Sequence, residues 1–199
     1  FGIRISEKTH PAFRHRIMTF STNPIWFQLN EDMTFHQKVN VMKNDNNWGG
    51  STNFYKAMEM ILNVCIENDV PPNEVSKMIL AIFSDMQIDV ANEGGLNMAT
   101  MMENIKMLYS EAGLKTKWKQ PYPIPHVLFW NLRKTNGFPC TVYEQNTSMI
   151  SGYSPVLLNT FTNKGVKDLK ETTPYSMLID ILNNSRYNFI NKFISKYYS

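Results

Sequence analysis

The sequence has few of the residues that build zinc sites and disulfides. Only two of its 199 residues are cysteines, Cys65 and Cys140, and they are far apart with no CxxC pair. Because no Cys or His pair has zinc-ligand spacing, a zinc site is disfavoured. Both cysteines fall in apolar runs and are expected to be small buried side chains. This usage is typical of a reducing compartment, so the sequence predicts a cytoplasmic protein.

The glycine-rich motifs that bind phosphates are also absent. The stretch NNWGGSTNFYKAMEMIL places glycines and hydroxyl residues directly before a helical pattern. A GxxxxGK[ST] loop needs a lysine before the hydroxyl residue, but Gly50 is followed directly by Ser51 and Thr52. No GxGxxG motif follows the first strand-like segment either. A phosphate-binding loop is therefore disfavoured.

Long hydrophobic runs and strong charge are missing as well. No apolar run reaches the roughly 18 residues of a membrane span, so no membrane partner is expected. The net charge is +3, from 20 basic and 17 acidic side chains, which is too mild to argue for a nucleic-acid groove. The histidines show no informative pairing and are expected to be structural: His10, His15, His36 and His126.

Strand-like and helix-like segments alternate from residue 15 to about residue 163. The strand-like segments are 15–22 and 24–29, which form a hairpin, then 77–85 and 126–132, both buried, and 140–145. The helical segments are 34–43, 54–68, 99–113, 154–163 and one or two C-terminal helices; residues 1–9 are the end of a helix or a short strand. Thr34 can cap one helix, and Gly113 is a plausible stop for another. The alternation predicts an α/β fold with a mostly parallel sheet and helices on both faces.

Two polar groups fall where the strands of such a sheet end, which is where ligands bind. Thr52 offers a hydroxyl at a helix start, and Asp85 offers a carboxylate at a strand end. Hydroxyl and carboxylate oxygens are ligands that magnesium prefers, but two oxygens do not make a site. The alternative interpretation is that Thr52 only caps its helix and Asp85 only caps a turn.

Three stretches in this order resemble a von Willebrand factor type A domain, which has a Rossmann-like α/β fold. They are WGGSTNFYKAM, ILAIFSDMQID and PHVLFWNLR. The stretches FSDMQID, MISGYSPVLLNTF and PYSMLIDILNNSRY resemble an uncharacterised family of plant, bacterial and large-DNA-virus proteins. The type A domain of that family is akin to that of the Ro autoantigen. The resemblance implies a type A domain over residues 1–165 and a C-terminal helical extension packed on it over 166–199.

The resemblance also implies a metal-ion-dependent adhesion site built from a DxSxS loop, a threonine and an aspartate. Thr52 matches the threonine and Asp85 the aspartate, whereas no DxSxS occurs in the sequence. Since FGIRISEKTH resembles the end of the family's first helix, the DxSxS loop and the first strand are expected just upstream of Phe1; the alternative is that this protein lacks them. That strand is normally central, so an upstream segment or another chain is expected to complete the sheet.

The implied function is a non-enzymatic protein-interaction module that uses Mg²⁺ or Mn²⁺. An acidic side chain of a protein partner would complete the coordination of the ion. The rim would consist of Ser51, Asn53, Asn92 and Glu93. For an enzyme, a general base beside the metal is required, and only Asp89 and Glu93 are near in sequence.

Two other functions stay open. RNA association follows by analogy with the Ro relative, and Trp118, Tyr122 and Trp130 lie near lysines. Such aromatic residues are more often core or surface residues than base-stacking platforms. The other alternative is a structural component of an assembly without metal, which in a viral protein would place it in the virion or virus factory.

Overall fold

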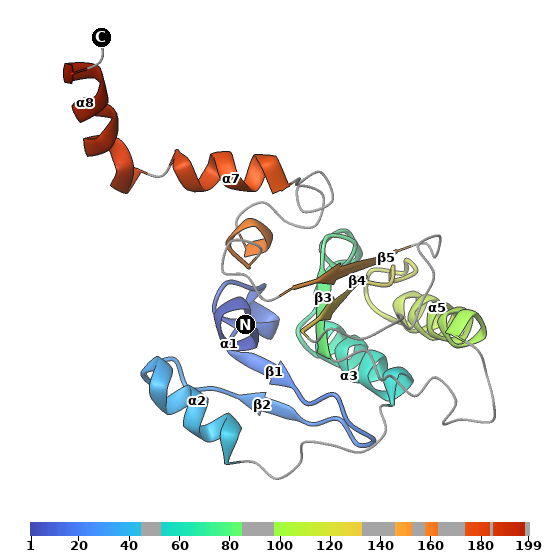
Figure 1. Ribbon diagram of the computed structural model, residues 1–199. Coiled ribbons are helices and arrows are strands. Elements are labelled where there is room, and N and C mark those ends of the chain that lie inside the picture. The colour runs from blue at the N-terminus through green and yellow to red at the C-terminus, as the bar shows by residue number, and fades with distance from the viewer. Residues whose placement is uncertain are drawn as a thin grey trace. The chain divides into compact units, whose positions relative to one another are not determined.

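The computed structural model describes residues 1–44, 53–84, 98–132, 146–152, 158–162, 174–183 and 185–197. The chain forms two compact units, Phe1–Tyr153 and Ser154–Ser199 (Figure 1). The expected domains, 1–165 and 166–199, stay a prediction.

A three-stranded parallel sheet forms the centre of the first unit. Its strands are β3 (Ile79–Ser84), β4 (His126–Asn131) and β5 (Thr147–Ser151), in the order β3-β4-β5. Helix α5 (Met98–Lys115) lies between β3 and β4 in sequence, as a crossover between parallel neighbours requires. The predicted α/β class is confirmed: the parallel sheet is flanked by helices, consistent with a Rossmann-like fold.

The predicted hairpin is confirmed as a separate two-stranded antiparallel sheet. Strands β1 (Arg16–Met18) and β2 (Trp26–Gln28) pair with Ile17 opposite Phe27. The turn is closed by the Thr19 amide, which donates to the carbonyl of Ile25 at 3.0 Å.

Short helices surround the hairpin, namely α1 (Gly2–Ser6), the 3-10 turn η1 (Pro11–Phe13) and α2 (Phe35–Lys43). Thr34 caps α2 as predicted: its side chain accepts from the Gln37 amide, and the Gln37 side chain accepts from the Thr34 amide. This reciprocal capping box satisfies two amides at the start of α2 that would otherwise lack partners.

Helices α3 (Phe54–Glu67) and α5 build the core against one face of the sheet (Figure 1). The hydroxyl of Tyr109 in α5 donates to the carbonyl of Met58 in α3 at 2.8 Å, and both residues are buried. The short helix α4 (Pro72–Val75) follows α3 and leads into β3. Cys65 is fully buried in this core, as predicted, whereas Cys140 lies outside the described residues. Burial raises the pKa of the Cys65 thiol to about 12, so it stays protonated at neutral pH and is not a nucleophile.

The other face of the sheet carries an aromatic cluster. The ring of Phe1, at the start of α1, packs edge-on against Phe83 at 5.7 Å and Trp130 at 5.3 Å between ring centroids. Trp130 follows Phe129, and successive side chains of a strand point to opposite faces. Phe129 belongs to the core cluster with α3 and α5, so Phe1 covers the opposite face.

Burial differs sharply between the two strands that the sequence predicts to be buried. In β4, every residue from Val127 to Asn131 is buried. In β3, only Ile82 is buried and the other five residues are half-buried. The prediction that β3 is buried on both faces is therefore wrong for the described part of the chain, because β3 lies at an edge of the sheet.

The second unit is helical where it is described. Residues 158–162 are helical, within the predicted segment 154–163, and are followed by α7 (Pro174–Leu182), the 3-10 turn η2 (Ser185–Tyr187) and α8 (Asn188–Tyr197). These confirm the predicted C-terminal helices. Among the helices of the described segments, none combines the length and the apolar character that crossing a bilayer requires.

Gly113 does not end its helix, which corrects the prediction from sequence. Helix α5 continues to Lys115. The reason for a glycine here is close packing, since a Cβ on Gly113 would lie 2.3 Å from the carbonyl oxygen of Gln120 and 2.4 Å from the amide nitrogen of Tyr122. Both of these are backbone atoms, which cannot swing away as a flexible side chain would.

We therefore expect Gly113→Ala to destabilise the protein by about 2 kcal/mol, because the added methyl group forces the backbone apart. Urea unfolding measures the change. Gly2→Ala is the matched control, since a Cβ there meets only the Ile17 side chain at 3.7 Å, an ordinary contact. Equal stability of the two variants would contradict the close approach at Gly113.

A partly buried ion pair joins Glu7, the residue that follows α1, to α2. The ammonium group of Lys38, whose side chain is 5% exposed, donates to Glu7 at 2.9 Å. Arg4 donates to the other carboxylate oxygen of Glu7, also at 2.9 Å. The Lys38 hydrogen bond, helped by Arg4 and opposed by burial, lowers the pKa of Glu7 below its ordinary value of 4.5.

Because the pKa of Glu7 is lowered on folding, its contribution to stability is present above pH 4.5 and is lost as pH falls through the lower folded value. We expect Glu7→Gln to cost about 2 kcal/mol at neutral pH, since Lys38 loses a charged partner. The variant should also lose less stability on acidification than the parent. Unfolding by urea at several pH values tests this, with the exposed Glu31→Gln as control; identical acid profiles for Glu7→Gln and the parent would contradict it.

Candidate functional site

Three polar side chains stand in one row where the parallel strands end. Ser84, Asn131 and Ser151 are the last residues of β3, β4 and β5, and the register pairs Ser84 with Asn131 and Asn131 with Ser151. Residues paired in register point to the same face of a sheet. The row therefore forms a polar margin, called here the carboxyl edge, on strands that are otherwise mostly apolar.

Backbone hydrogen bonds hold this edge together. The amide of Leu132 donates to the carbonyl of Ser84 at 3.2 Å, and the amide of Gly152 donates to the carbonyl of Asn131 at 3.1 Å. The indole of Trp130 also donates to the Gly152 carbonyl, at 2.9 Å. Asn131 is only 1% exposed, so its side-chain amide is surrounded by protein atoms rather than by solvent.

The start of α3 arrives at the same edge. Phe54, the first residue of α3, lies 6.3 Å from Phe129 between ring centroids, and Phe129 is opposite Ile82 near the ends of the strands. Asn53 caps the helix, since its side chain accepts from the Lys56 amide at 2.8 Å. Its own amide donates to the carbonyl of Ser21 at 3.2 Å. The capping bond gives the Asn53 oxygen a structural role beside the predicted one in the rim.

The other site residues predicted from sequence, Thr52, Asp85, Ser51, Asn92 and Glu93, lie outside the described residues. Their described neighbours in sequence are informative, because Asn53 follows Thr52 and Ser84 precedes Asp85. Asn53 and Ser84 both belong to elements that meet at the carboxyl edge. Sequence reasoning missed Asn131 and Ser151, although a polar residue that ends an apolar run, as in HVLFWN, is a usable signal.

The chemistry of the carboxyl edge suits a hard cation only in part. Its described side chains have hydroxyl and amide oxygens, which are of the ligand type that Mg²⁺ and Mn²⁺ accept, but they carry no negative charge. Within the described segments, no three or more His, Cys, Asp or Glu side chains come together as a metal site. The negative charge would have to come from Asp85, so the metal stays a prediction.

The aromatic residues considered for RNA stacking are mostly unavailable. Trp130 is fully buried and Tyr122 is 3% exposed, so both are core residues. The hydroxyl of Tyr122 donates to the carbonyl of Val70 at 2.7 Å. Trp118 is 36% exposed, and the Lys117 ammonium lies 5.1 Å from its ring centroid. A single exposed ring is a weak platform for nucleic acid.

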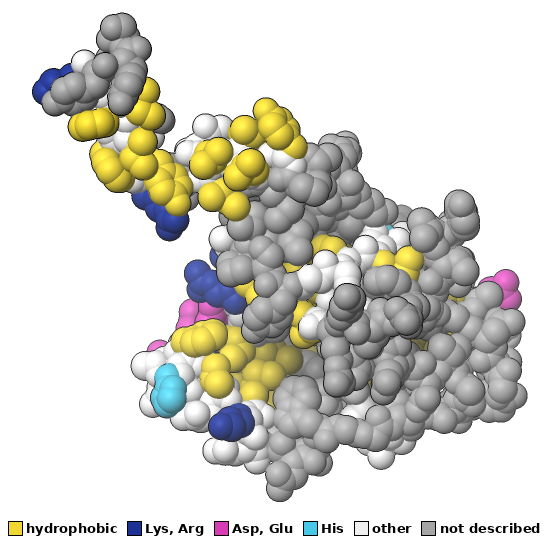
Figure 2. All heavy atoms as spheres, viewed as in Figure 1, with side chains coloured by type: hydrophobic (Ala, Val, Ile, Leu, Met, Phe, Trp, Pro, Cys, Tyr) yellow, Lys and Arg dark blue, Asp and Glu magenta, His cyan; other side chains and the backbone are white. Residues whose placement is uncertain are grey.

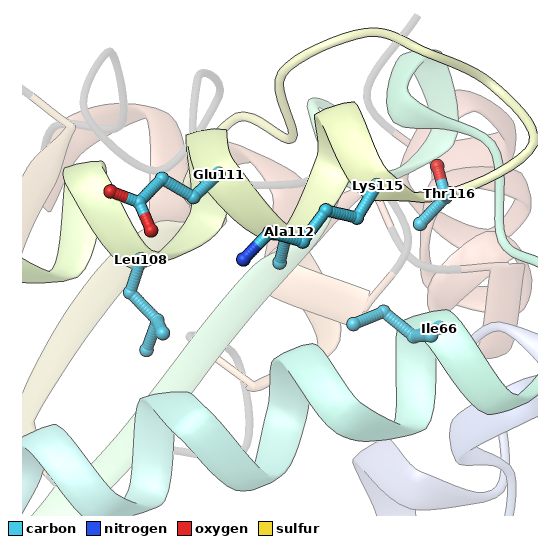
Figure 3. A pocket seen from close by; sticks show the side chains of 6 residues that line it. All are labelled: Ile66, Leu108, Glu111, Ala112, Lys115 and Thr116. Atoms are coloured by element: carbon cyan, nitrogen blue, oxygen red, sulfur yellow. The ribbon is translucent and has the colours of Figure 1, made fainter.

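A small pocket lies between α3 and α5, away from the carboxyl edge. Its volume is about 260 Å³. It is lined by Ile66, Leu108, Glu111, Ala112, Lys115 and Thr116 (Figure 3). Ile66 belongs to the last turn of α3, whereas Phe54 at the other end of that helix is near the carboxyl edge. The pocket contains none of the predicted site residues, so the carboxyl edge is the better candidate site.

Comparison with known proteins gives a family without an assigned activity. An uncharacterised protein of Acanthamoeba polyphaga mimivirus is 31% identical over 183 residues, which cover 91% of this chain and 29% of the relative. The chain thus spans less than a third of that viral protein. No solved structure matches. A family model described as a domain of unknown function (DUF7788) matches residues 1–188, and the chain belongs to this family.

Proposed function

We propose that the first unit is a non-enzymatic protein-interaction module of the von Willebrand factor type A kind, and that its binding surface is the carboxyl edge. The observation that carries this proposal is the in-register row of Ser84, Asn131 and Ser151 at the ends of the parallel strands. Ligands of open parallel sheets bind at this edge. The start of α3 contributes further polar groups beside it.

The proposed surface includes a divalent cation, Mg²⁺ or Mn²⁺, with Thr52 and Asp85 among its ligands. Support comes from the neighbours of these two residues, since Asn53 and Ser84 belong to elements that meet at the carboxyl edge. The cation would supply an open coordination position for an acidic side chain of the partner. Ser51, Asn53, Asn92 and Glu93 would form the rim.

A further strand, from an upstream segment or another chain, is the second part of the proposal. Within the described segments, β3 pairs on one side only, with β4. Natural edge strands are protected by charged residues, prolines or bulges, because unpaired backbone groups invite aggregation. The sequence of β3, ILAIFS, contains no charged residue and no proline. It suits a strand that is paired on both sides.

Metal binding is tested by isothermal titration of MgCl₂ and MnCl₂ into the full-length protein that carries this chain, together with thermal unfolding. A specific cation should stabilise the fold by about 2.7 kcal/mol at a hundredfold excess over its dissociation constant. Thr52→Ala and Asp85→Ala should each abolish this stabilisation, because each removes an oxygen ligand.

The controls are Thr34→Ala and Asp32→Ala, the same substitutions at exposed positions in or near α2. Thr34→Ala should cost about 1 kcal/mol through its lost helix cap and still respond to the cation. The metal proposal is overturned if the parent protein shows no response. A response that Thr52→Ala and Asp85→Ala retain in full would place the cation elsewhere.

The added strand is tested by hydrogen exchange of the 199-residue chain and of the full-length protein. Amides on the open side of β3 should exchange quickly in the short chain and become protected when the further strand pairs with them. Strand β4 is the internal control, because it is paired on both sides in either case. Equal exchange of β3 in the two proteins would count against an upstream strand. Protection that appears only after a partner is added would assign the strand to another chain.

A further inference from the structure

The sequence of α8 places its apolar residues on one side of the helix and its polar residues on the other. The apolar and aromatic positions recur at the spacing of one helical face and are Phe189, Ile190, Phe193, Ile194 and Tyr197. Every other residue of the helix is polar or basic, namely Asn188, Asn191, Lys192, Ser195 and Lys196. Such a pattern is expected of a helix that lies between water and an apolar phase.

Within the described part of the second unit, the apolar side of α8 is exposed and does not pack in a core. Phe189 is 68% exposed, Phe193 58% and Ile194 49%. Helix α7 adds large exposed side chains, which are Tyr175, Leu178, Ile181 and Leu182. Figure 2 shows apolar side chains gathered over both helices. An apolar surface of this kind marks an interaction site, because a soluble monomer rarely leaves one uncovered.

The charge of residues 183–199 indicates which kind of partner would bind them. From residue 183 to residue 199 there are three basic residues, Arg186, Lys192 and Lys196, and no acidic residue, while α7 carries one acidic residue, Asp180. Two copies of the chain would bring like charges together, which disfavours self-association through α8. An anionic surface with an apolar interior would attract the basic residues and bury the phenylalanines.

Tyrosines at the helix ends suit the headgroup level of a lipid surface. Tyr175 is near the start of α7, Tyr187 lies between the helices, and Tyr197 ends α8. Tyrosine has an apolar ring and a polar hydroxyl, and it is enriched at the level of lipid headgroups. We propose that α8, assisted by α7, binds an anionic membrane surface by lying in the headgroup layer with Phe189 and Phe193 toward the acyl chains.

This mode of binding differs from a membrane span. An interfacial helix needs a separated apolar face and basic residues, not an apolar length that crosses the bilayer. The expectation from sequence that no membrane is involved rested on the lack of a long apolar run. The inference is independent of the proposed function of the carboxyl edge.

The test is co-sedimentation of the full-length protein with two kinds of vesicles. One kind is phosphatidylcholine alone, and the other contains about one third phosphatidylserine. We expect the partition coefficient to be about 100-fold higher on the anionic vesicles, since each of three basic residues contributes about fivefold. Lys192→Gln combined with Lys196→Gln should lower it about 25-fold. Phe189→Ser combined with Phe193→Ser should lower it by about 30-fold or more.

Matched controls carry the same substitutions elsewhere. Phe35 on α2 is 61% exposed, and Phe35→Ser should leave vesicle binding unchanged. Lys115→Gln combined with Lys119→Gln removes two charges outside the segment and should change binding far less than the α8 pair. Phe193→Trp keeps the apolar face and provides a fluorescent probe, whose emission should shift to the blue on anionic vesicles only.

Three outcomes would overturn the inference. One is that Phe193→Trp shows no spectral shift and the parent no sedimentation with either vesicle. Another is equal binding to neutral and anionic vesicles, which would remove the role of the basic residues. A third is lipid-free self-association that the double serine variant abolishes, because the occupant of α8 would then be a second copy of the chain.

Discussion

The burial of β4 on both faces is the constraint on which the rest of the first unit depends. Residues Val127 to Asn131 are all buried, and a strand can be covered twice only if different elements pack on its two sides. Phe129 packs with α3 and α5, while Trp130 meets the ring of Phe1. The same strand sets the register of both neighbours, so its last residue, Asn131, also centres the polar row of the candidate site.

Features that depend on nearby residues could be predicted from sequence, and features that depend on distant residues could not. The cap at Thr34 and the apolar stripe of α3 are determined within a few residues. Strand β5, in contrast, is short and half polar, and it gains its pairing only from β4. Gly113 looked like a helix stop because glycine commonly ends helices. Its actual constraint is the backbone near Gln120, which no local pattern contains.

The candidate site, too, has features that the sequence could predict and features that it could not. The alternation of strands and helices led us to expect polar ligands at the carboxyl ends of the strands. In the structure, Phe54 at the start of α3 lies near Phe129 of β4, and the end of β3 pairs with the end of β4. The sequence did not predict that Asn131 and Ser151 lie beside Ser84 in the polar row, because only the register of the strands aligns the three residues. Single polar residues at strand ends are common. What distinguishes these three is their alignment across three strands.

Among the described strands of the parallel sheet, the two outer ones, β3 and β5, have different compositions, and this difference bears on the candidate site. Strand β5, TSMIS, is rich in hydroxyl groups and tolerates water at an edge, whereas β3, ILAIFS, is apolar up to Ser84. A strand added beside β3 in the parallel direction would end next to Ser84. The loop after that strand would then extend the polar row on the side where Asp85 follows β3 in sequence. Under the proposed function, one added segment would pair the side of β3 that has no partner strand within the described segments, and it would also supply polar ligands to the carboxyl edge.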